Sequence, residues 1–110
     1  MEVTVALREY GSVHTRHTLA QVVRARLEQV LAQLPADSAL LIDCSGVRSM
    51  SPLYARTAFR DLFVAHALGE HGAQTLDVVG AEPQVEVVLN DLLHESDLLP
   101  VSATHRTIGG

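Results

Sequence analysis

The chain has 110 residues, a formal net charge of −5 and 47% hydrophobic residues, which fits one domain with one core, residues 1–110. All eight basic residues are Arg, so a lysine Schiff base and a P-loop ammonium are excluded. The acidic balance and only four aromatic residues argue against nucleic acid as the main partner.

The sequence shows neither a membrane-spanning apolar run nor the pattern of a secretory signal. The apolar runs are far shorter than the roughly 20 residues that cross a bilayer, and MEVTVALREYG lacks the basic-then-apolar order of a secretory signal. We therefore expect a cytoplasmic protein that does not bind membranes. The single cysteine, Cys44, cannot form an internal disulfide.

The first half of the chain reads as strand, helix and strand. MEVTVAL alternates apolar and polar residues as a strand does, ending at Gly11 and Ser12. Apolar residues at helical spacing predict a helix over 15–34, capped by Thr15 or Thr18 and closed by Pro35. After a turn at 35–38, the apolar run 39–44 predicts a central strand covered by protein on both faces.

The second half reads as helix, strand and helix, with a tail. Ser51 followed by Pro52 is a strong helix start, with the serine as cap and the proline at the first helical position. Gly69 and Gly72 offer left-handed endings to that helix. TLDVVG (75–80) reads as a strand, Pro83 opens a third helix, and the tail 98–110 adds a short strand at most.

This order predicts the α/β class, with a small, mostly parallel four-stranded sheet and three to four helices. Parallel strands bring their carboxyl ends to one edge, where open α/β sheets usually bind ligands. The turn after the central strand is therefore the first place to look for chemistry.

Most candidate residues at that turn have a structural explanation. Asp43 has no partner carboxylate or nucleophile–base pair near it in sequence, so we expect it to accept hydrogen bonds from the Ser45 or Gly46 backbone. One glycine without a lysine does not make a nucleotide loop. Cys44 is expected to be a buried small hydrophobe.

Histidine pairs do not predict a metal site. His14 and His17, like His66 and His71, have no carboxylate or thiolate at a recognised ligand spacing, so we expect them on solvated faces. No metal or other cofactor is predicted.

The turn and its flanks resemble the STAS domain of anti-sigma-factor antagonists and sulfate transporters. The similarity rests on IDCSGVRSMSP, the helix after it, and VVGAEPQVEVVLNDLL, and it covers about residues 15–104. The resemblance implies a module that binds a protein, such as a histidine-kinase-like ATPase or another switch protein. The structural turn is then made by Asp43, Ser45, Gly46 and Pro52.

The chain departs from the phosphorylatable members of that family. There, the methionine is followed by an Asp-Ser pair whose serine takes a phosphate, whereas Met50 is followed by Ser51 and Pro52. The usual phosphoacceptor is thus missing. The resemblance is closest to STAS-like domains of unassigned function, through Thr15-Arg16, Tyr54-Ala55 and a single leading strand. That group often has two acids where this chain has Arg56 and Thr57.

The sequence therefore predicts a non-catalytic regulatory module of bacterial signalling or transcription control. Arginines are favoured at interfaces, and the expected partner surface, with Tyr54 included if exposed, is Arg48, Ser49, Ser51, Tyr54, Arg56 and Arg60. Two alternatives stay open: an antagonist phosphorylated on Ser51 or Ser49, and a small enzyme or ligand-binding domain at the strand ends. The partner's identity and the oligomeric state, a dimer among the options, are left open.

Overall fold

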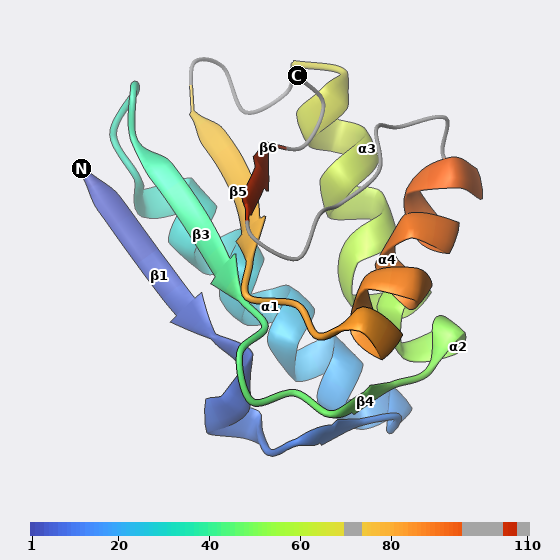
Figure 1. The fold of residues 1–110 in the computed structure, drawn as a ribbon. Helices are drawn as coiled ribbons and strands as arrows, with labels where there is room; N and C mark the ends of the chain where they lie inside the picture. Colours follow the sequence, from blue (N-terminus) through green and yellow to red (C-terminus); the bar gives the residue numbers. More distant parts are fainter. Residues whose placement is uncertain (70–73, 96–104, 108–110) are drawn as a thin grey trace.

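The fold is known from a computed structural model, which describes residues 1–69, 74–95 and 105–107 (Figure 1). The strands are β1 (Glu2–Ala6), β2 (Val13–His14), β3 (Ala39–Asp43), β4 (Ser49–Met50), β5 (Thr75–Val79) and β6 (His105–Thr107). The helices are η1 (Leu7–Tyr10), α1 (His17–Gln33), α2 (Pro52–Ala55), η2 (Arg56–Arg60), α3 (Asp61–Ala67) and α4 (Pro83–Glu95). The predicted α/β class is confirmed.

The main sheet has the strand order β1-β3-β5-β6, with the first three strands parallel and β6 antiparallel to β5. The steps from β1 to β3 and from β3 to β5 run in the same direction. Two crossovers of the same hand must then lie on the same face of the sheet. In Figure 1, α1 accordingly passes behind β3 and β5.

The core lies between this face and the helices. Register places Val5, Ile42 and Val78 side by side across the sheet, and all three are buried. On the opposite face Leu41 is only half-buried and its neighbour Thr4 is exposed. The expected cover of 39–44 by protein on both faces is therefore only partial on this second face, because both crossovers place their helices on the other side.

Helix α1 begins two residues later than predicted and without a threonine cap. Arg16 is its N-cap residue, no side chain accepts from the first turn, and Thr18 lies inside the helix. Its end follows the prediction, since Leu34 before Pro35 is extended with ψ 136°. Helix α4 begins at Pro83, as the sequence predicts.

Helices α2, η2 and α3 form one continuous helical segment, with a π-helical stretch at η2. The buried residues Ala58 and Phe59 belong to that stretch. An ion pair between Arg24 Nη2 and Asp61 Oδ2 (3.0 Å) joins α1 to the start of α3. The left-handed ending expected at Gly69 is present, with φ +80°, while Gly72 lies outside the described residues.

Strands β2 and β4 form a small parallel ribbon that the sequence did not predict. Val13 pairs with Ser49 and His14 with Met50, so His14 and Met50 point into the core and the other two point outward. The expected short strand in the tail is present as β6, and most of the tail lies outside the described residues. In the described part of the chain, no helix has both the length and the apolar character needed to cross a membrane.

Candidate docking surface at the start of α2

The turn after β3 is held by Asp43. Its Oδ1 accepts from the Ser45 backbone N–H at 2.9 Å, as expected, and its Oδ2 accepts from Arg8 Nη1 at 3.0 Å. Burial opposes ionisation of this carboxyl, but the hydrogen bonds from Ser45 and Arg8 outweigh burial and lower its pKa. Asp43 is thus an ionised acceptor that fixes the turn.

The loop after β5 crosses this turn closely at Gly80. A Cβ there would collide with Ser45 Oγ and would lie 3.1 Å from Asp43 Oδ1. The backbone at Gly80 also has φ +69°, a conformation that side chains disfavour. Glycine is required at this crossing, where the loops that follow β3 and β5 meet.

The start of α2 is closed by its own residues. Ser51 Oγ accepts from the Tyr54 backbone N–H at 3.1 Å, and Pro52 occupies the first helical turn. The Ser51 backbone N–H donates to the carbonyl of His14 at 3.0 Å. The predicted cap is therefore present, and it directs the Ser51 oxygen toward the helix backbone.

Arg48 and Ser49 lie just before this helix start and are exposed. The Arg48 backbone is fixed on both sides, by its N–H to the Ser12 carbonyl (2.8 Å) and by its carbonyl accepting from Gln84 Nε2 (2.9 Å). A short rigid segment therefore presents both side chains to solvent.

Arg56 and Arg60 are exposed at the two ends of η2. At a rise of about 1.5 Å per residue, Arg60 lies on the order of 13 Å along the helix from Ser51. The predicted partner residues therefore form a strip that runs from β4 along α2 and η2, rather than one compact cluster.

Tyr54 does not belong to that strip, because only 1% of it is exposed. Its hydroxyl lies 2.6 Å from Nδ1 of His14, which is itself fully buried, and His14 Nε2 lies 2.8 Å from the Gly11 carbonyl. A carbonyl only accepts, so Nε2 carries a proton, and in the neutral ring Nδ1 accepts from Tyr54. The predictions that Tyr54 contacts a partner and that His14 lies on a solvated face are therefore both wrong.

The reason for both errors lies in the β2–β4 ribbon, which turns His14 inward toward the helix that carries Tyr54. Burial raises the pKa of Tyr54, and the hydroxyl stays protonated as a hydrogen-bond donor. Tyr54 is buried against a histidine that is distant in the chain, so the residues next to Tyr54 in the sequence do not indicate its burial.

Cys44 is buried, as predicted. Burial, with a smaller contribution from the Asp43 charge, raises the pKa of the thiol to about 12. A neutral thiol is a poor nucleophile, so Cys44 packs as a small hydrophobe at the end of β3.

Within residues 1–69, 74–95 and 105–107, no three His, Cys, Asp or Glu side chains gather closely enough to hold a metal ion. His17 is exposed, His66 is half-buried and His71 lies outside the described residues.

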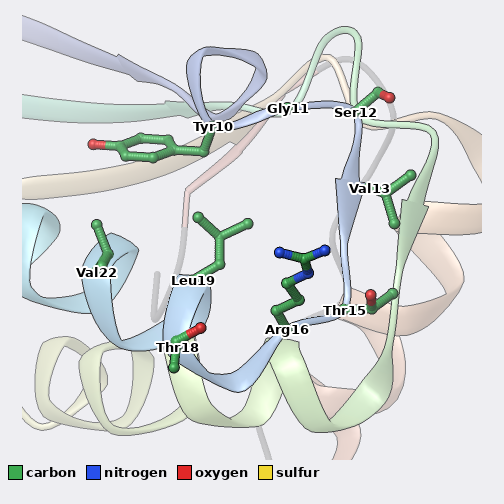
Figure 2. Close-up of a pocket in the computed structure, with 9 residues that line it drawn as sticks. All are labelled: Tyr10, Gly11, Ser12, Val13, Thr15, Arg16, Thr18, Leu19 and Val22. Atoms are coloured by element: carbon green, nitrogen blue, oxygen red, sulfur yellow. The ribbon is translucent and has the colours of Figure 1, made fainter.

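A groove beside the start of α1 is a further feature of this region that the sequence analysis did not predict. It has a volume of about 670 Å³ and is lined by residues from Tyr10 to Val22 (Figure 2). The groove adjoins the strip of predicted partner residues, because Val13 on the groove wall pairs with Ser49 of that strip. The run of hydroxyl residues around Arg16 was the only available signal, and it was interpreted as a helix cap.

No protein-family model, curated protein or solved structure matches this chain.

Proposed function

We propose that the chain is a STAS-like, non-catalytic module of bacterial cytoplasmic signalling that binds a protein partner through the strip Arg48, Ser49, Ser51, Arg56 and Arg60. The observation that carries the proposal is the start of α2. Its serine hydroxyl is engaged as a cap and its next residue is proline, while the flanking Arg48 and Ser49 are exposed on a fixed backbone.

The crowding at the strand ends supports binding over catalysis. A Cβ at Gly46 would lie 3.3 Å from Arg8 Cβ, and the crossing at Gly80 is tighter still. Loops packed this closely leave little room for a substrate between them. The ionised Asp43 is bound to Arg8 and Ser45 and therefore acts as a positioning group.

The partner class comes from the family resemblance: a histidine-kinase-like ATPase or another switch protein. Exposed arginines suit such a contact, because opposite charge on a partner raises the association rate and fixes the orientation of the complex. With the Ser51 oxygen turned to the helix backbone and a proline ring beside it, we expect binding to be constitutive rather than switched by phosphate.

The partner surface is tested by capture from the native cell. Arg48→Glu and Arg60→Glu, combined, should leave the thermal melt nearly unchanged, because exposed charges contribute roughly 0–1 kcal/mol. Capture should fall about tenfold or more, as expected for charge reversal at an interface. Arg26→Glu, on the exposed side of α1, is the matched control. Undiminished capture by the double variant contradicts this surface.

The second candidate is a phospho-switch, favoured by the exposure of Ser49 and by the tolerance of a helix N-terminus for negative charge at Ser51. Two measurements decide between the phospho-switch and constitutive binding. One is the intact mass of the protein from its native cell, and the other is partner capture by Ala and Asp variants of each serine. A stoichiometric phosphate lost in one Ala variant, with the matching Asp variant failing in capture, would establish the switch. Unmodified protein with full capture supports constitutive binding.

A further inference from the structure

The groove at the start of α1 has a charge that the rest of the fold does not neutralise. Arg16 projects into it, its guanidinium pointing into the space between Leu19 and Val13 (Figure 2). Arg8 pairs with Asp43, and Arg24 pairs with Glu28 and Asp61. Within residues 1–69, 74–95 and 105–107, no carboxylate forms an ion pair with Arg16, and none lines the groove.

The helix end beneath Arg16 adds to this positive field. The N-cap residue Arg16 forms no side-chain cap, and the first turn of α1 contains no acidic residue. The positive end of the helix dipole therefore lies at the groove uncompensated. The same end carries the hydroxyls of Thr15 and Thr18, both exposed and both part of the groove lining. In a protein of net charge −5, this is a local site for a negative group.

The remaining wall is apolar. Val13 and Val22 are 56% and 54% exposed, and both line the groove. Half-buried Leu19 and Tyr10 complete this side. A volume of about 670 Å³ lies within the range of small-molecule sites. An apolar wall next to one unpaired cation matches a ligand with an anionic head and an apolar body.

We propose that this groove binds a small amphipathic anion, with its carboxylate or phosphate on the Arg16 guanidinium and its hydrocarbon part against Val13, Leu19 and Val22. Guanidinium forms charge-assisted, bidentate hydrogen bonds with both headgroups. The valines, exposed in the free protein, are covered when the ligand binds. This site borders the strip proposed for the protein partner but shares no residue with it, and it does not depend on that proposal.

The test is an NMR titration of the ¹⁵N-labelled chain at low salt with three probes that carry the same five-carbon alkyl chain: hexanoate, pentyl phosphate and hexanamide. We expect amide shifts to concentrate in residues 10–22 for at least one anion. The neutral amide should bind about tenfold more weakly, because it forms no ion pair. The anion that binds more tightly shows whether the groove recognises a carboxylate or a phosphate.

Variants separate the groove from general charge effects. Arg16→Gln should weaken binding of the preferred anion about tenfold, whereas Arg26→Gln, elsewhere on α1, should leave it unchanged. Val22→Glu, which brings a negative charge to an exposed wall position, should abolish binding while the spectrum stays folded. The proposal is overturned by absent shifts, by equal binding of hexanamide, or by an Arg16→Gln variant that binds as tightly as the parent.

Discussion

Two helix starts lie side by side in this molecule and are built differently. Strands β2 and β4 pair in parallel, and each is followed within three residues by a helix. At α2, Ser51 caps the backbone and Pro52 removes one donor. At α1, the N-cap residue is Arg16, no side chain caps the turn, and a groove opens beside it.

The difference shows that geometry alone does not decide what a helix start can do. Both ends carry the same partial positive charge from their backbone. At α2, a hydroxyl of the chain accepts from a free backbone N–H group. This helix start therefore needs no external ligand, and it is a rigid support for neighbours such as Arg48. Where no hydroxyl does so, positive character remains for an external group.

The largest loss of stability is expected from a change at Gly80, which packs against the turn that leads to α2. Gly80→Ala introduces a collision with Ser45 Oγ and strain at φ +69°, which should destabilise the protein by about 3 kcal/mol. Gly69→Ala is the control: its φ is +80°, but no atom lies within 4 Å of the new Cβ, so about 1 kcal/mol is expected. Urea unfolding measures both, and equal losses would show that the close crossing contributes nothing.

The next effect is expected at the pair that joins the two starts, since His14 precedes α1 and Tyr54 belongs to α2. Tyr54→Phe keeps the ring but leaves buried His14 Nδ1 without its donor, which should cost about 2 kcal/mol. Tyr10→Phe, at a half-buried tyrosine, should change stability by less than about 0.5 kcal/mol. Thermal unfolding of the two variants is compared; a Tyr54→Phe variant as stable as the parent would contradict the buried hydrogen bond.

The smallest effect compares the two starts directly. Ser51→Ala removes the cap of α2 and should cost about 1 kcal/mol. Thr15→Ala changes the exposed residue that precedes the N-cap of α1 and should have an effect below about 0.5 kcal/mol. Chemical denaturation of both variants gives the difference. If Thr15→Ala costs as much as Ser51→Ala, the start of α1 has a cap after all and the positive end beside the groove is compensated.

Local chemistry is what the sequence determined. The α/β order, the helix start at Ser51 and Pro52, the end of α1 before Pro35 and the Asp43 to Ser45 bond all depend on residues close together in the chain. Each follows from a hydroxyl near a free N–H, a proline ring or a periodicity that one segment carries by itself.

Only the tertiary structure decided the rest, because it depends on contacts between distant segments. Pairing of β2 with β4 buries His14 against Tyr54, 40 residues away, and so reverses the expected exposure of both. Two crossovers on the same face leave one side of β3 half-covered. The groove around Arg16 likewise lies between residues 10–13 and the start of α1, since a cavity exists only where chain segments meet without filling the space between them.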